Sequence, residues 1–288
     1  MFDTKWIAMP VAVATSLLAL PLAVIGTANA ADASTTCELK PGKGIVSISV
    51  TGVEVGVDIK RGSDDKLLVD ADLCTSTGGT PADMSNTKVI RVRGGVSDQS
   101  VRIDLSGGAF APGRGDETGT SDEIEFKIAL GEGLDDVHVV AGDDPAWVYA
   151  GSRKGVHRLN LNADEDSAVD ADVNVRGAEF VHFEGGSSND RFVGSGGMGT
   201  GKAFAVRLNL SDGVGGNDFL FGGRRADDIY DYASSADNDT LRGGAGADII
   251  SSYDLDTTGD LVDAGDGIDT CAYNEVDVVT NCELDAQN

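Results

Sequence analysis

The chain has 288 residues, with 48 acidic and 22 basic residues, 39 glycines and a formal net charge of −26. Hydrophobic residues make up 41 %, enough for a folded core, and the glycines lack the every-third spacing of collagen. The charge excludes nucleic acid and anionic membrane surfaces as expected partners, and its self-repulsion predicts that a bound cation offsets part of it.

The first thirty residues predict a cleaved secretory signal. Lys5 precedes an apolar run over residues 6–26, and Ala28-Asn29-Ala30 fits the small-x-small cleavage rule. We therefore assign residues 1–30 to a signal peptide and expect a secreted protein, monomeric and without a membrane anchor.

The rest of the chain reads as short strands separated by turns. Apolar and polar residues alternate with period two in segments such as 45–50, 89–93, 101–105 and 124–128. Residues 106–122 form the longest segment without a strand pattern, are rich in Gly and predict an exposed loop. This pattern predicts an all-β protein, with N-terminal β-rich coils over 31–135 and a repeat region over 136–288.

Weak repeats begin in the middle of the chain. Val137-His138 and Val181-His182 lie 44 residues apart, and the glycine turns at 141–149 and 185–193 align at the same offset. Residues 157–162 also resemble residues 206–211, which predicts neighbouring, equivalent units.

The C-terminal third carries a firm repeat of nine-residue frames. Each of six frames has aspartate at its sixth position and an apolar residue or Cys271 at its eighth. The gaps between these aspartates alternate between nine and twelve residues, so the full unit is 21 residues and holds two frames. The sixth-position aspartates are Asp218, Asp227, Asp239, Asp248, Asp260 and Asp269.

These frames resemble the RTX, or hemolysin-type, calcium-binding nonapeptide GG-x-G-x-D-x-U-x. The frame at 243–251 (GGAGADIIS) matches every specified position, 264–272 (AGDGIDTCA) lacks only the first Gly, and 185–193 is an outlying copy. The resemblance implies a right-handed parallel β-helix, or β-roll, in which turn carbonyls and the aspartate hold Ca²⁺ between coils. The closing segment 266–283 is similar to that of secreted calcium-binding repeat proteins of Gram-positive actinobacteria.

Two frames in each coil place the aspartates on two edges. Glycine gives a turn the backbone freedom to bring carbonyls together, and carboxylate and carbonyl oxygens suit Ca²⁺. We therefore expect calcium mainly on the edge with the glycine-rich turns, in the gaps 227/248 and 248/269. The expected ligand residues there are Asp227, Gly243, Gly244, Gly246, Asp248, Gly265, Asp266, Gly267 and Asp269, with Asp190, Asp218, Asp239 and Asp260 as weaker candidates.

Four cysteines remain in the secreted chain, and their spacing is not that of a zinc site. An even number in an oxidising compartment predicts two disulfides, and Cys37–Cys74 with Cys271–Cys282 is the simplest of three pairings.

Two other functions stay open beside a non-enzymatic calcium-binding protein. A carbohydrate-active β-helix enzyme, a lyase or glycosidase, would need paired carboxylates, and Asp143-Asp144 beside Trp147 is the best local candidate. A surface adhesin stiffened by calcium would present residues 106–122, which include Arg114-Gly115-Asp116, to an extracellular protein or polysaccharide.

Overall fold

A computed structural model describes residues 33–111, 113, 123–162, 171–232, 236–253 and 257–286. The expected signal peptide and most of the expected loop at 106–122 lie outside these residues. The described chain contains no α-helix, one short 3-10 turn, η1 (Leu105–Gly107), and many short strands, which confirms the all-β prediction. The strands are β1 (Ser34–Lys40), β2 (Ile45–Thr51), β3 (Val55–Arg61), β4 (Leu67–Val69), β5 (Asp72–Leu73), β6 (Val89–Arg93), β7 (Gln99–Asp104), β8 (Glu125–Ala129), β9 (Asp136–Val140), β10 (Trp147–Arg153), β11 (Val156–Asn162), β12 (Val173–Arg176), β13 (Phe180–Glu184), β14 (Arg191–Val193), β15 (Arg207–Ser211), β16 (Phe219–Phe221), β17 (Asp228–Tyr230), β18 (Thr240–Arg242), β19 (Ile249–Ser251), β20 (Leu261–Asp263), β21 (Thr270–Ala272), β22 (Val278–Thr280) and β23 (Leu284–Asp285).

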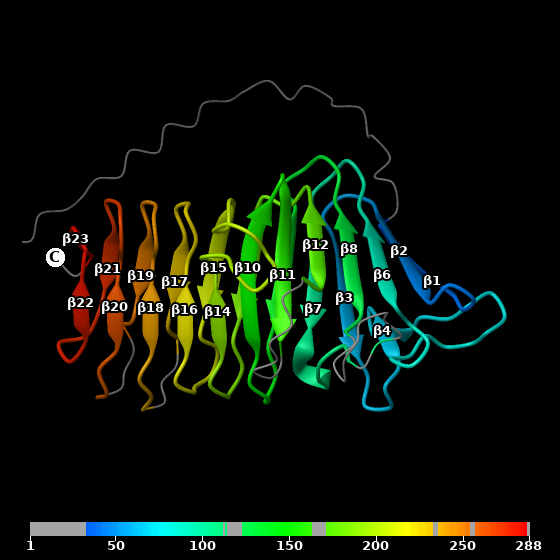
Figure 1. Ribbon diagram of the computed structural model, residues 1–288, viewed down its shortest axis with the longest axis horizontal. Helices are drawn as coiled ribbons and strands as arrows, with labels where there is room; N and C mark the ends of the chain where they lie inside the picture. The colour runs from blue at the N-terminus through cyan, green and yellow to red at the C-terminus, as the bar shows by residue number, and fades with distance from the viewer. Residues whose placement is uncertain are drawn as a thin grey trace, which may run out of the picture. The chain divides into compact units, whose positions relative to one another are not determined.

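The strands form two long sheets. A 12-stranded sheet has the order β1-β2-β6-β8-β12-β11-β10-β14-β16-β18-β20-β22, and an 11-stranded sheet has the order β23-β21-β19-β17-β15-β13-β9-β7-β3-β4-β5. From β12 onward consecutive strands alternate between the sheets, so each coil gives one strand to each, as Figure 1 shows from green to red. This is a β-solenoid, and both sheets continue across the boundary expected at residue 136.

The 21-residue register of the sequence is the register of the coils. Leu220 pairs with Leu241 and Leu241 with Val262 in one sheet, and Ile229, Ile250 and Cys271 stack in the other. All six side chains are buried, because the eighth position of each frame points inward. The 44-residue offset is also confirmed, since Val137 pairs with Val181 and Trp147 with Arg191 in parallel.

One predicted equivalence is wrong. Residues 157–162 lie in β11, which is antiparallel to β10 and β12 in the 12-stranded sheet, whereas residues 207–211 form β15 in the other sheet. The two segments share an alternating pattern because both have one buried face, and that pattern does not encode strand direction. β10 and β11 form a hairpin whose tip turns at Lys154 and Gly155, both with positive φ.

Both predicted disulfides are confirmed. Cys37 of β1 is joined to Cys74, and Cys271 of β21 is joined to Cys282 in the last coil. They lie near the two ends of the solenoid, where β1 and the β4–β5 pair are antiparallel additions at one end and β22 and β23 are the last strands at the other. Two disulfides indicate an oxidising, extracellular environment.

Candidate metal centre

The sixth-position aspartates are buried and bonded to one another from coil to coil. On one edge, the backbone N–H of Asp218 donates to Oδ1 of Asp239 (2.8 Å), and that of Asp239 donates to Oδ1 of Asp260 (2.8 Å). The same chain of bonds starts at Asp190, whose N–H donates to Asp218, and ends at Asp277, which accepts from Asp260. Each carboxylate thus satisfies a turn N–H of the preceding coil, a structural role that does not itself require an ion.

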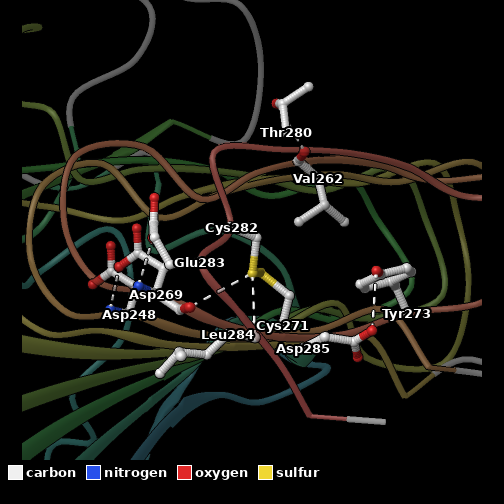
Figure 2. Close-up of a disulfide and its surroundings, with 10 residues drawn as sticks. All are labelled: Asp248, Val262, Asp269, Cys271, Tyr273, Thr280, Cys282, Glu283, Leu284 and Asp285. Atoms are coloured by element: carbon white, nitrogen blue, oxygen red, sulfur yellow. Dashed lines mark hydrogen bonds between the residues drawn. A yellow bond between two sulfur atoms is a disulfide. The ribbon is translucent and has the colours of Figure 1, made fainter. Parts of the chain in front are cut away.

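The other edge has an equivalent ladder. The N–H of Asp227 donates to Oδ1 of Asp248 (2.8 Å), and the N–H of Asp248 donates to Oδ1 of Asp269 (2.7 Å). Glu283 closes this ladder by accepting from the N–H of Asp269, as Figure 2 shows beside the Cys271–Cys282 disulfide. Asp227 differs from its neighbours, because its Oδ2 also accepts from Gly223 N–H.

The first glycine of a frame makes room for this buried carboxylate. A Cβ placed on Gly243 would lie 2.4 Å from Oδ2 of Asp248, and one on Gly222 would lie 2.7 Å from Oδ2 of Asp227. Neither distance is sterically allowed, so the Gly and the Asp of one frame depend on each other. In the last frame, however, Ala264 stands at this position and is itself buried.

The glycine-rich turns stack directly through their backbones. Asp266 N–H donates to the carbonyl of Gly244 (2.8 Å), and Gly246 N–H donates to that of Asp266 (2.9 Å). Gly265 and Gly267 approach the carbonyls of Gly244 and Gly246 so closely that an added Cβ would collide with each. Turn carbonyls that the resemblance assigns to calcium therefore already accept hydrogen bonds from the neighbouring turn. The Asp266 side chain points to solvent.

Three buried aspartates converge on the edge of the weaker candidates. One side-chain oxygen from each of Asp212, Asp231 and Asp239 lies within 4.8 Å of the others. The exposed fractions of these residues are 0 %, 1 % and 2 %. We call this group the acidic triad. Among the described residues it is the one set of three or more His, Cys, Asp or Glu side chains placed to share a metal ion.

The triad is assembled from the ends of three strands. Asp212 follows β15, Asp231 follows β17, and Asp239 immediately precedes β18 in the facing sheet. Parallel pairing of β15 with β17 stacks the first two residues, and Asp239 lies against them at the start of a strand of the facing sheet. Asp218 and Asp260, above and below Asp239 in the ladder, are the neighbouring carboxylates.

Burial makes ionisation of these carboxyls costly. Loss of solvent raises the pKa of Asp231 to about 10, with a further contribution from the charge of Asp212. Loss of solvent likewise raises the pKa of Asp239 to about 8 and that of Asp218 to about 9, each reinforced by neighbouring aspartates. The same cause raises the pKa of Asp248 only to about 6 and that of Asp227 to about 7. The largest shifts therefore lie on the edge of the triad.

The triad fits a hard divalent cation. Oδ1 of Asp239 accepts from Asp218 N–H, but its Oδ2 is buried and accepts no hydrogen bond from the described chain. A buried carboxylate oxygen without a donor is unfavourable unless it is protonated or bound to a cation. Carboxylate oxygens suit Ca²⁺ or Mg²⁺, whereas zinc sites use nitrogen and sulfur ligands as well.

Sequence reasoning missed two of the three triad members. Asp212 and Asp231 lie just outside the nine-residue frames, one residue after a strand of the 11-stranded sheet. Ser252 occupies the same place in the next coil, since the N–H groups of Asp212, Asp231 and Ser252 donate in turn to Tyr230, Ser251 and Ala272. The signal that could have found them is a polar residue two positions after the buried apolar residue of a strand. Among the described strands from β15 onward, this pattern recurs only at Asp212, Asp231 and Ser252, which is too few times to stand out in the sequence.

The carboxylate candidates for an enzyme lie elsewhere. Asp144 and Trp147 line a hollow of about 60 Å³ together with Phe110 and Phe126.

Comparison with known proteins identifies no family. No model of a protein family matches the chain, and no curated protein matches it. Separately, the described residues contain no helix long and apolar enough to cross a membrane. The function must therefore be argued from the solenoid and its buried carboxylates.

Proposed function

We propose that this is a secreted, non-enzymatic calcium-binding β-solenoid whose folding is coupled to the ion. The observation that carries the proposal is the acidic triad, three buried aspartates whose side-chain oxygens lie within 4.8 Å of one another. Asp212, Asp231 and Asp239 would each supply at least one carboxylate oxygen. The ion would supply positive charge that offsets the cost of ionising Asp231 and Asp239, whose pKa values burial raises.

Calcium is favoured over magnesium for two reasons. Ca²⁺ accepts about 6–8 oxygen ligands in irregular geometry, which suits ligands drawn from three different strand ends. Mg²⁺ requires near-octahedral coordination and retains its waters, which is difficult at a site where all three residues are at most 2 % exposed.

The glycine-rich turns remain further candidates, on the strength of the nonapeptide resemblance. Asp227, Asp248 and Asp269 bond to one another in the ladder, and Oδ2 of Asp248 and of Asp269 is buried without a hydrogen-bond donor in the described chain. Binding there would add a cation to turns that already stack through their backbones.

Substitution of one aspartate on each edge tests where calcium acts. Calcium-induced increases in melting temperature would be compared for the wild type, Asp239→Asn, Asp248→Asn and the exposed control Asp144→Asn. Asparagine keeps an oxygen for the ladder hydrogen bond and removes the charge. We expect Asp239→Asn to lose most of the calcium response, Asp248→Asn to lose less, and Asp144→Asn to retain it.

Calorimetry with Ca²⁺ and Mg²⁺ completes the test. We expect Ca²⁺ to bind with a dissociation constant of about 10⁻⁴–10⁻³ M, a range common for extracellular modules. The same melting curve in chelator and in millimolar Ca²⁺ would refute calcium binding. A larger loss in Asp248→Asn than in Asp239→Asn would move the principal site to the glycine-rich edge.

A further inference from the structure

The strongest feature outside the carboxylate ladders is a basic pocket. Residues 145–163 and 191–211 contain six Lys or Arg residues and no Asp or Glu, although the whole chain has 48 acidic residues. These two stretches meet where the tip of the β10–β11 hairpin faces the loop between β14 and β15. They enclose an open pocket of about 910 Å³ whose charged lining is Arg153, Lys154, Lys202 and Arg224.

These four cations have no acidic partner in the described chain. No carboxylate lines the pocket, and no ion pair or side-chain hydrogen bond joins their charged groups to other described residues. The 11-stranded sheet differs, since Lys60 and Arg102 of its outer face pair with Asp104, and Arg207 with Asp228. In a chain with a net charge of −26, four unpaired cations around one hollow form a local site for an anion.

The pocket is held by a frame of backbone bonds. Ser152 and Lys202 exchange two backbone hydrogen bonds (2.8 and 3.2 Å), which join the hairpin to the β14–β15 loop. The Arg158 side chain donates to the carbonyl of Gly199 on the same loop, and the His157 ring packs against Phe204 at 5.1 Å. Because the protein's own backbone and side chains make these contacts, little conformational entropy has to be lost when a ligand binds.

A second hollow extends the site. It shares His157 and Ala205 with the basic pocket and adds the cation Arg225; its lining also holds Arg207, which is paired with Asp228, and one carboxylate, Glu179. Arg225 is anchored by a hydrogen bond to the carbonyl of Ala205 (3.2 Å). The cations thus lie along two adjoining hollows instead of around one point, which fits a ligand with several separated negative charges.

We propose that these two adjoining hollows bind a short acidic oligosaccharide, with sugars that carry carboxylate or sulfate groups. Guanidinium and ammonium groups bond such oxyanions by charge-assisted hydrogen bonds. Apart from His157, the lining contains no aromatic ring on which a nucleobase could stack, so the cations themselves are the recognition groups. The negative charge of the rest of the protein repels long polyanions, which limits the ligand to a short chain. The site is independent of the calcium centre.

Binding calorimetry on the intact protein in Ca²⁺ tests this proposal with defined probes. The probes are a galacturonate tetramer, a sulfated tetrasaccharide, a neutral maltotetraose and inorganic tripolyphosphate. We expect at least one acidic tetrasaccharide to bind, with an affinity that falls as salt is raised, and the neutral sugar not to bind. Binding of tripolyphosphate alone, or of neither acidic sugar, would overturn the proposal.

Matched charge-removing variants locate the site. Lys202→Gln combined with Arg224→Gln should weaken binding of the acidic tetrasaccharide by about tenfold or more, because two charge-assisted hydrogen bonds to the ligand are lost. Lys43→Gln, an exposed lysine of the β1–β2 turn, is the control and should leave binding unchanged. Equal weakening by the control would show non-specific attraction and contradict the site. Unchanged circular dichroism checks that the double variant is folded.

Discussion

At the scale of single residues, the aspartate of each frame has two separable roles. Its Oδ1 accepts a backbone N–H from the preceding coil, as in the bond from Asp218 to Asp239. Its Oδ2 is left for a proton, a glycine N–H or a cation, and Asp227 shows the second of these with Gly223. The same residue type can therefore build the coil in one place and bind an ion in another.

The two roles of Asp239 predict effects of opposite sign. In chelator at pH 8, Asp239→Asn should stabilise the protein by about 1 kcal/mol, because it removes a buried carboxyl whose pKa is raised to about 8 and keeps the Oδ1 acceptor. In millimolar Ca²⁺ the variant should be less stable than the wild type. Chemical denaturation under both conditions measures this, and destabilisation of the same size in both would assign Asp239 a purely structural role.

At the scale of elements, the last coil depends on its covalent and polar closure. β22 and β23 are strands of three and two residues, and Val278 and Leu284 are 59 % and 51 % exposed. Strands this short bury little apolar surface, so the Cys271–Cys282 disulfide and the Glu283 carboxylate hold this end, as Figure 2 shows.

Removing the Cys271–Cys282 disulfide should destabilise the last coil more than the rest of the solenoid. Replacing Cys271 and Cys282 by alanine removes a bond with a sequence separation of 11, for which the chain-entropy model gives a loss of about 3 kcal/mol. Hydrogen exchange should increase first in β21–β23 and leave β2, β6 and β8 protected. The milder variant Glu283→Gln, which keeps an oxygen acceptor for Asp269, should change exchange little. Uniform loss of protection along the chain would contradict local closure.

At the scale of the whole molecule, the ladder carboxyls couple stability to pH. Aspartate in an unfolded chain has a pKa of about 3.9, whereas burial raises the pKa of Asp218 to about 9 and that of Asp239 to about 8. Between these values the folded state binds more protons, so the free energy of unfolding falls as pH rises, by up to about 1.4 kcal/mol per pH unit for each group.

The metal-free protein should therefore be more stable at pH 5 than at pH 9. Calcium should oppose the decline, because it binds the ionised carboxylates and becomes tighter as protons leave. Melting temperatures across this range, in chelator and in Ca²⁺, measure both effects. Asp218→Asn with Asp239→Asn should flatten the metal-free profile and so separate these groups from the general repulsion of an acidic surface. A metal-free stability that rises with pH would contradict the assignment.

The repeat in the sequence predicts those features of the fold that depend on local geometry and on equal coil length. Period-two alternation and the 21-residue register predict strands, the stacking of Leu220 on Leu241, and an inward eighth position, because each depends only on local geometry and identical coil length. The even number of cysteines likewise predicts two disulfides, and the simplest of the three pairings is the one that the structure contains. The alternating pattern does not encode the direction of a strand, and for that reason it predicts an equivalence of β11 and β15 that the structure does not have.

By itself, the sequence determined the all-β class, the coil length and the inward-facing apolar position of each frame. Only the tertiary structure brought Asp212 and Asp231 to Asp239, since residues outside the frames meet when a strand end of one sheet faces a turn of the next coil. Only the tertiary structure also gathered Arg153, Lys202 and Arg224 around one pocket. Both sites join residues that the repeat does not align, because a repeat pattern fixes which residues stack between coils but not which strand ends and loops meet across them.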